Sequence, residues 1–130
     1  MKVRRKISCF TLFWLSLLVG CSEERPDPSF PRVTVVGKVV RARSPIRSGW
    51  IEFVPVDGGR GVLRSAEIQN DGTYEMTGLG PGLHAVRIIV PRDRTLFPFD
   101  KFFSPIRRTL TEDSQQEFLI DLDQEPNQPL

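Results

Sequence analysis

The sequence has 130 residues, and its 18 basic and 16 acidic side chains give a formal net charge of +2. It contains one histidine and two cysteines, and because neither cysteine is expected to remain a free thiol, as argued below, the lone histidine cannot assemble a usual zinc site of three or four ligands. Once a leader of 20 residues is set aside, the length suits one domain of roughly a hundred residues.

Residues 1–20 have the organisation of a secretory signal peptide, with a basic head, the apolar run Ile7–Val19 and then Gly20. A transmembrane span is the alternative, but it needs about 20 apolar residues, more than this run offers. Removal of the signal takes four basic residues and no acidic one, so the mature chain carries a net charge of −2. The basic balance belongs to the precursor, and we expect no nucleic-acid partner.

The signal ends in Leu18-Val19-Gly20-Cys21, which resembles the lipobox of bacterial lipoproteins. The resemblance implies lipid attachment to the Cys21 sulfur, cleavage before Cys21 and acylation of the new amino terminus, for example by palmitate. An ordinary signal peptide that merely contains a cysteine is the alternative. Two or more acyl chains make a stable membrane anchor. Ser22 follows the lipidated position, and by analogy with lipoprotein sorting it favours the outer membrane or the periplasmic face of the cell envelope.

The remaining chain divides into three parts: a lipidated cysteine and flexible tether at 21–31, a domain at 32–124 and a disordered tail at 125–130. The tether has three prolines and three acids after Cys21 and almost nothing to bury. Because Cys9 leaves with the signal and Cys21 is acylated, we expect no disulfide, and the domain must be stabilised by its core.

The first half of the domain predicts strands at Val33–Val40, Trp50–Val56 and Val62–Gln69, separated by connections rich in turn residues. Gly37 interrupts the first strand, where a missing side chain indicates a close backbone approach or a bulge. Pro55 places the end of the second strand at an edge, because proline cannot donate to a ladder. The expected inward residues are Val33, Val35, Val39, Ile51, Phe53, Ala66 and Ile68.

The stretch Ile68–Val90 predicts a β-meander with turns at 70–72 and 78–82. The alternation places Tyr74 and Met76 on a buried face, followed by His84, Val86, Ile88 and Val90 on one face of the next strand. Beyond it, residues 91–116 lack a period, Leu110 and its neighbours suggest a short strand, and Phe118, Ile120 and Leu122 alternate in a closing strand. The fold class is therefore all-β, a sandwich of six or seven short strands.

Several short motifs, mostly at turns and core positions, follow one another in a familiar order. They are V-x-G-K-V at 35–39, Pro45-Ile46, G-W-I-E-F-V-P at 49–55, A-x-I-x-x-D-G-x-Y-E at 66–75, G-x-G-P-G-x-x-x-V at 78–86 and P-x-D-K-F-F-S-P at 98–105. In this order the chain resembles the carboxypeptidase-regulatory-like, transthyretin-like domains of small bacterial envelope lipoproteins. The resemblance implies a seven-stranded, two-sheet sandwich and supplies no catalytic residue. The arginine-rich first loop and His84, where the family often has tyrosine, depart from the pattern.

Catalytic and metal-binding chemistry has little support in the sequence. Any Ser/His/Asp mechanism would have to use His84, whose place in an alternating strand favours a packing role. The hydroxyisourate hydrolase of the transthyretin-like fold uses several histidines and a distinctive C-terminal motif, and both are missing here. The turn Asn70-Asp71-Gly72 and the pair Asp121 and Asp123 offer possible calcium ligands, but a hairpin turn and a solvated strand face explain them better. No phosphate loop is present, and we expect no cofactor, no metal and no enzymatic activity.

Two groups of side chains are candidate binding surfaces. Loops at one end of a sandwich can form a shared patch for an anionic polymer or the acidic face of a partner. The candidate arginines are Arg41, Arg43, Arg47, Arg60 and Arg64, and the candidate aromatics are Phe97, Phe99, Phe102 and Phe103. Solvated arginine loops and a plug of phenylalanines at the sandwich end are the alternatives. The sequence thus predicts a lipid-anchored, non-catalytic envelope module that binds a protein or has a structural role; a carbohydrate-binding or adhesion module is the alternative, and an enzyme is less favoured.

Overall fold

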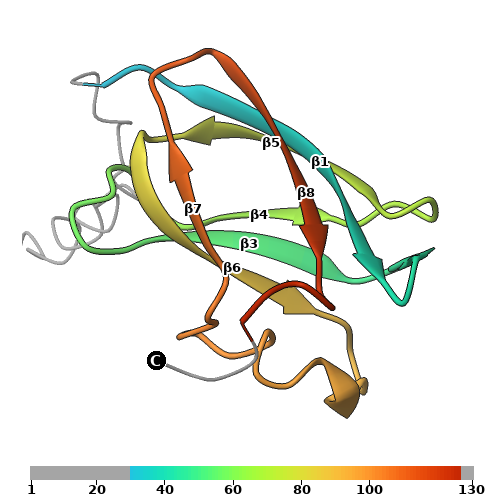
Figure 1. Cartoon of the computed structure of the whole chain (residues 1–130). Coiled ribbons are helices and arrows are strands. Elements are labelled where there is room, and N and C mark those ends of the chain that lie inside the picture. The colour runs from blue at the N-terminus through green and yellow to red at the C-terminus, as the bar shows by residue number, and fades with distance from the viewer. Residues whose placement is uncertain (1–29, 127–130) are drawn as a thin grey trace, which may run out of the picture.

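Two β-sheets pack face to face in the computed structural model, which describes residues 30–126 (Figure 1). The first sheet contains β1 (Val33–Arg41), β2 (Ser44–Pro45), β5 (Thr73–Leu79) and β8 (Gln115–Asp121). The second sheet contains β3 (Trp50–Pro55), β4 (Arg64–Glu67), β6 (Gly82–Ile89) and β7 (Arg107–Leu110), and the short 3-10 helix η1 spans Arg94–Leu96. The all-β sandwich is therefore confirmed. The signal peptide, Cys21, tether residues 21–29 and tail residues 127–130 lie outside the described residues.

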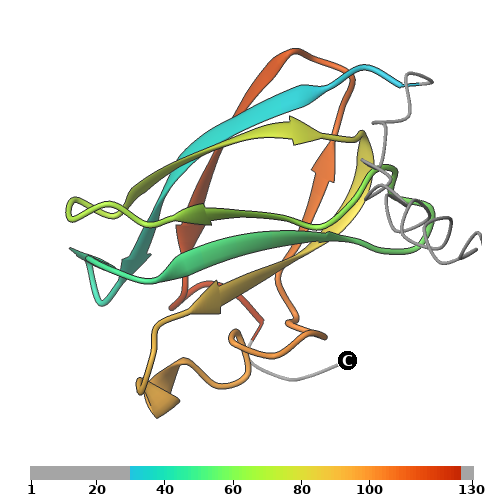
Figure 2. The ribbon, with the colours of Figure 1, turned by 180° about the vertical axis from the view of Figure 1, so that it is seen from behind.

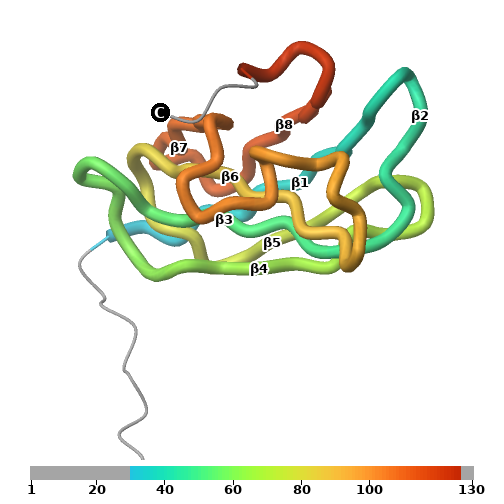
Figure 3. Tube along the Cα trace, turned by 90° about the horizontal axis from the view of Figure 1, so that it is seen from below, coloured from blue at the N-terminus to red at the C-terminus, as the bar shows by residue number. Residues whose placement is uncertain are grey.

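The strand order places β1 and β3 inside their sheets. β1 pairs antiparallel with β5 and parallel with β8, while β3 pairs antiparallel with β4 and β6, and β6 continues to β7. The β4–β5 connection joins the two sheets at one edge and the β7–β8 connection joins them at the other, as the views from behind and from below show (Figures 2 and 3). Each sheet thus covers the apolar face of the other.

The described residues contain eight strands, where the family resemblance implied seven. The additional strand is β2, a two-residue piece in which Pro45 pairs with Val40 and Ser44 with Arg41. β4 is also shorter than the expected strand Val62–Gln69. In this ladder Val62 would lie opposite Pro55, which has no N–H to donate, so the pairing ends at Arg64.

The core lies between the sheets and uses the alternation that the sequence predicts. All the expected inward residues of β1, β3 and β5 are buried, and Ala66, Val90 and Phe118 are partly buried against them. Phe53 is at the centre, with ring centroids 6.4 Å from Tyr74 and 6.1 Å from His84. Each fully buried large side chain contributes about 1.5–3 kcal/mol of hydrophobic stabilisation.

Gly37 allows three strands of the first sheet to meet closely, as its missing side chain predicted. A Cβ at this position would lie 2.0 Å from the carbonyl oxygen of Phe118 and 2.7 Å from the Tyr74 hydroxyl. The Tyr74 hydroxyl instead donates a hydrogen bond of 3.1 Å to that carbonyl. This bond crosses β1 and joins β5 to β8, so it fixes the buried phenol in the core.

Candidate binding surface

His84 is enclosed in the core, with no exposed surface. Its Nδ1 lies 3.0 Å from the Gly82 carbonyl oxygen, so this nitrogen carries the proton and donates it to that carbonyl. Its Nε2 is buried without a hydrogen-bond partner among the described residues. Burial lowers the pKa of His84, and the hydrogen bond to Gly82 opposes this effect. The imidazole is therefore neutral and out of reach of a solvent-borne substrate in this conformation.

The candidate calcium ligands serve local turns. Asp71 accepts hydrogen bonds from the amide and hydroxyl of Thr73 at 3.0 and 2.6 Å, which lowers the pKa of its carboxyl. Asp121 accepts from the Asp123 amide, and Asp123 accepts from the Ala42 amide across the sheet end. Among the described residues no three His, Cys, Asp or Glu side chains gather as metal ligands would. In residues 30–126, no helix has the length and apolar character of a membrane span.

The candidate arginines fall into two groups at opposite ends of the sandwich. Because β1 runs antiparallel to β5, and β3 to β6, the connections at 41–49, 69–72 and 90–95 share one end. The connection at 56–63 lies at the other end (Figures 1 and 2). Arg41, Arg43 and Arg47 are thus separated from Arg60 and Arg64. The expected patch shared by all five arginines does not form, because the two loops follow strand ends of opposite direction.

The arginine loop contacts a different partner, the long segment at 91–106, which we call the aromatic segment. The Arg41 guanidinium donates a 2.6 Å hydrogen bond to the Thr95 hydroxyl in η1. Asp93 accepts from the Thr95 amide and hydroxyl, and these bonds, with Arg41 nearby, lower the pKa of its carboxyl. The two loops that the sequence suggested as separate candidates therefore adjoin.

The aromatic segment divides its phenylalanines between the core and the surface. Phe99 is 7% exposed and is buried with Leu96 and Ile106, whereas Phe97 is 59%, Phe102 49% and Phe103 68% exposed. The segment lies along β6, because the Ile88 amide donates to the Phe99 carbonyl at 2.9 Å and the Val86 amide to the Ile106 carbonyl at 3.0 Å. One phenylalanine therefore plugs the sandwich and three are presented to solvent, where their role in binding stays a prediction.

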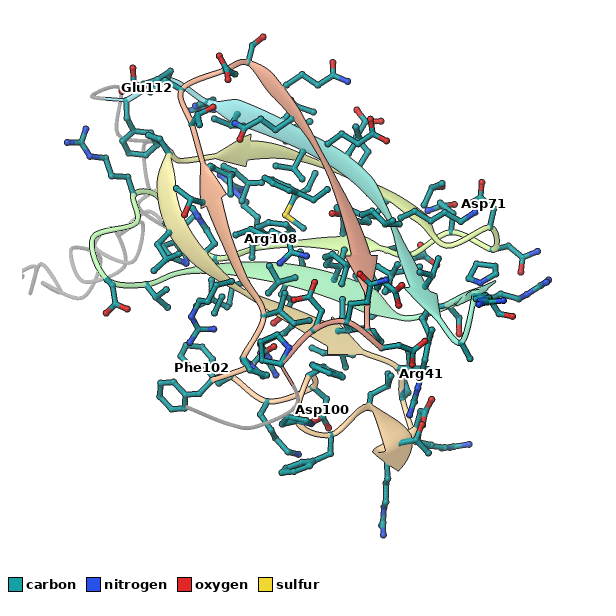
Figure 4. All side chains as sticks on the ribbon, viewed as in Figure 1. Arg41, Asp71, Asp100, Phe102, Arg108 and Glu112 are labelled. Carbon is teal, nitrogen blue, oxygen red and sulfur yellow. The ribbon has the colours of Figure 1, made fainter. Side chains whose placement is uncertain are left out.

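Arg87 fastens the aromatic segment to the second sheet. Its guanidinium lies 2.7 Å from the Glu52 carboxylate and donates to the Asp100 carbonyl at 3.3 Å. The same guanidinium lies 5.8 Å from the centroid of the Phe102 ring, within cation–π range. Figure 4 shows Asp100 and Phe102 on the outside of the sandwich, on the side of the second sheet. The exposed aromatics thus have a fixed base.

Cationic side chains accompany the exposed rings. Lys101 lies 5.8 Å from the centroid of Phe97, and Phe102 and Phe103 form an edge-to-face pair with centroids 5.4 Å apart. Arg92 and Arg94 are exposed at the start of the same segment. These two arginines were missed in the sequence, although the charged run Pro91–Arg94 directly after a strand was a visible signal. We call Arg92, Arg94, Phe97, Lys101, Phe102 and Phe103 together the aromatic–cationic surface.

An open groove of about 860 Å³ lies at the other edge of the sandwich, where β4 and β5 meet. Trp50, which is 48% exposed, lines it together with Lys38, Glu67 and Glu75. The sequence placed Trp50 at the start of a strand without assigning it to a surface. Its indole ring offers a face for stacking beside charged hydrogen-bonding groups.

Comparison of the chain with protein-family models, curated proteins and solved structures found no match. A proposal of function therefore rests on the geometry of the aromatic–cationic surface and of the groove beside Trp50.

Proposed function

We propose that the chain is a lipid-anchored, non-catalytic module of the bacterial cell envelope that binds a protein through the aromatic–cationic surface. The observation that carries this proposal is the exposure of Phe97, Phe102 and Phe103 on a segment whose other large apolar side chains are buried. Exposed apolar groups gathered in this way mark interaction sites. Aromatic side chains and arginine are also the residues that dominate the binding energy of protein interfaces.

The fold we propose is transthyretin-like, in the carboxypeptidase-regulatory-like group. The two packed sheets support it, as do the places of the sequence motifs. The D-G pair at 71–72 lies in the β4–β5 turn, and the glycine-rich motif at 78–82 covers the end of β5, the β5–β6 turn and the start of β6. The additional strand β2 lies in the arginine-rich loop, where the sequence already departs from the family.

The lipid anchor rests on the signal peptide and on the lipobox ending at Cys21. Eleven residues at 21–31 reach at most about 40 Å when fully extended. The chain enters the sandwich at the start of β1, at the end opposite the Arg41–Arg47 loop (Figure 1). The module would therefore be held by one end and would present its other end away from the membrane. The enclosure of His84, the one histidine of the chain, supports a non-catalytic role.

The experiment is a comparative pull-down from detergent-solubilised envelope with the intact lipoprotein as bait. A variant with Phe97, Phe102 and Phe103 all changed to serine should lose specific protein partners that the wild type retains. Val62→Ser with Leu63→Ser is the matched control, because these side chains are 47% and 42% exposed at the opposite end. Equal retention of the same proteins by the triple variant would contradict the proposal.

A carbohydrate-binding module is the second candidate, and the groove beside Trp50 favours it. An exposed tryptophan flanked by Glu67, Glu75 and Lys38 offers stacking and hydrogen bonding to a sugar ring. The exposed phenylalanines would also fit an adhesion role. This candidate predicts retention on purified envelope glycans and its loss in Trp50→Ala, whereas protein binding predicts that Trp50→Ala leaves the pull-down unchanged.

A further inference from the structure

We infer that the partner offers an acidic segment carrying apolar side chains to the aromatic–cationic surface. The inference rests on the proposed function and adds the chemistry of the partner. It starts from the charges that point outward from the aromatic segment. Arg92 and Arg94 are exposed, and within residues 30–126 neither takes part in an ion pair.

The acidic groups of this region are already engaged. Asp93 accepts two hydrogen bonds from Thr95. Glu52 is paired with Arg87, and Asp100 is less exposed than Lys101, with side chains 28% and 58% exposed across a 3.3 Å contact. The charged groups left to meet a partner are therefore Arg92 and Arg94, beside the exposed rings. A carboxylate near Arg92 and Arg94 would gain complementary charge, which guides association and fixes register.

The rings and cations lie within one short stretch of chain, residues 92–103. Lys101 lies beside Phe97, while Phe102 and Phe103 follow directly and pack edge to face. An extended segment with carboxylates next to apolar side chains would pair with both kinds of group at once. A neutral apolar segment would leave Arg92 and Arg94 unpaired, and an acidic segment without apolar side chains would leave the rings in water.

An anionic bilayer offers similar chemistry, because exposed aromatics and basic residues also bind lipid surfaces. The position of the surface argues against this ligand. β1 has nine residues and spans about 30 Å, and the aromatic segment lies below the second sheet, away from where β1 begins (Figures 1 and 2). The tether enters the domain at the start of β1, so the aromatic segment lies on a part of the domain that is held away from the anchor.

The test is site-specific photo-crosslinking of the full lipoprotein in cells, with p-benzoylphenylalanine in place of Phe103. Leu119, which is 61% exposed on β8, is the matched control position. Crosslinked adducts are digested and the partner peptides are sequenced. We expect adducts from position 103 on segments that carry a net negative charge and contain leucine, isoleucine, valine or phenylalanine, and we expect these adducts to be missing at position 119.

Charge reversal makes the test specific. Arg92→Glu combined with Arg94→Glu should reduce the adduct from position 103 at least tenfold, with the melting temperature and lipid attachment unchanged. Arg60→Glu, at the opposite end of the sandwich, should leave the adduct unchanged.

The outcomes separate this inference from the proposed function. Protein adducts on neutral or basic segments, or adducts that persist after charge reversal, overturn the inference and leave protein binding standing. Adducts only with lipid overturn it in favour of membrane docking. If neither position yields a protein adduct, the proposed function and the inference both fail.

Discussion

Phe53 is the residue whose contacts hold the two sheets together most directly. It is fully buried and its ring meets Tyr74 and His84. Phe53→Ala should reduce the free energy of unfolding by about 3–5 kcal/mol, because the variant loses transfer energy and leaves a cavity. Denaturant titration measures the change.

The control for this experiment must be a truly exposed side chain. Glu52, the neighbour of Phe53, is bonded to Arg87 and is therefore unsuitable. Glu75→Ala on β5 should change the stability by less than about 0.5 kcal/mol. Equal losses in Phe53→Ala and Glu75→Ala would mean that the inward and outward faces are assigned in reverse.

His84 should make the stability of the domain depend on pH. Burial lowers the native pKa of His84, whereas in the unfolded chain the group titrates near its ordinary value of about 6.5. Above that pH both states are neutral and the stability is fully present. As the pH falls through about 6.5, the unfolded chain binds a proton at His84 that the native state does not bind. The free energy of unfolding therefore declines until the lower native pKa is reached, with a slope of at most about 1.4 kcal/mol per pH unit.

The comparison is between wild type and His84→Phe in denaturant titrations from pH 7.5 to pH 5. The variant should lose the pH dependence in this range, since the chain has no other histidine. The carboxyl pKa values of Asp71 and Asp93 are lowered, so their effect falls at lower pH. An identical slope in the variant would show that His84 is not the group responsible.

At the residue scale the sequence predicted burial well in regular strands and poorly in the aromatic segment. Alternation identified Ile51, Phe53 and Ile88 because a strand turns every second side chain inward. It could not separate Phe99 from Phe97 or Phe103. A phenylalanine ring is equally apolar whether it is buried or exposed. Where the sequence has no strand or helix period, only tertiary contacts, such as the bond from the Ile88 amide to the Phe99 carbonyl, determine which rings are buried.

Among the elements, β1 depends on Gly37 for its two-sided pairing. In Gly37→Ala the new methyl group would meet the Phe118 carbonyl at 2.0 Å, so either the β1–β8 pairing or the Tyr74 hydrogen bond must give way. We expect a loss of about 3 kcal/mol or more in the free energy of unfolding. Gly58→Ala is the control: it has open space around it, and its φ of +88° alone should cost about 1–2 kcal/mol. A Gly37→Ala protein as stable as the wild type would refute this close approach.

The aromatic segment should loosen when its anchor is removed. Arg87→Ala deletes the pair with Glu52 and the hydrogen bond to Asp100, and we expect the domain to lose about 1–2 kcal/mol. Hydrogen exchange should quicken at the Ile88 amide, which donates to Phe99, more than in β1. Unchanged protection of Ile88 would mean that the segment is held by its buried side chains alone.

The strand pattern explains which elements could be predicted. The longer strands were visible because each alternates over several residues, but β2 was not. Its turn uses Ala42 and Arg43 at φ of +48° and +61°, a conformation that such residues seldom adopt, so no turn residue marked it. The parallel pairing of β1 with β8 was equally hidden, since it joins residues about 80 positions apart.

At the scale of the whole molecule, the sandwich brings the arginine loop to the aromatic segment and separates it from Arg60 and Arg64. The directions of the strands determine which loops share an end of the sandwich. These directions cannot be read from a single sequence until the strand pairing is known. The ion pair of Arg108 with Glu125 also ties the first residue of the expected tail to β7. The cellular localisation, in contrast, could be predicted from a local signal, because a signal peptide and a lipobox are recognised without any tertiary structure.

We propose that this sandwich works at a membrane, where it is held by lipid bonded covalently to Cys21. The most direct measurement is the intact mass of the protein purified from envelope, compared with a Cys21→Ser variant. We expect a wild-type chain that begins at Cys21 and carries the mass of a diacylglyceryl group and an amide-linked acyl chain, while the variant lacks lipid and leaves the membrane fraction. A wild-type protein without lipid, partitioning to the soluble fraction like the variant, would contradict it.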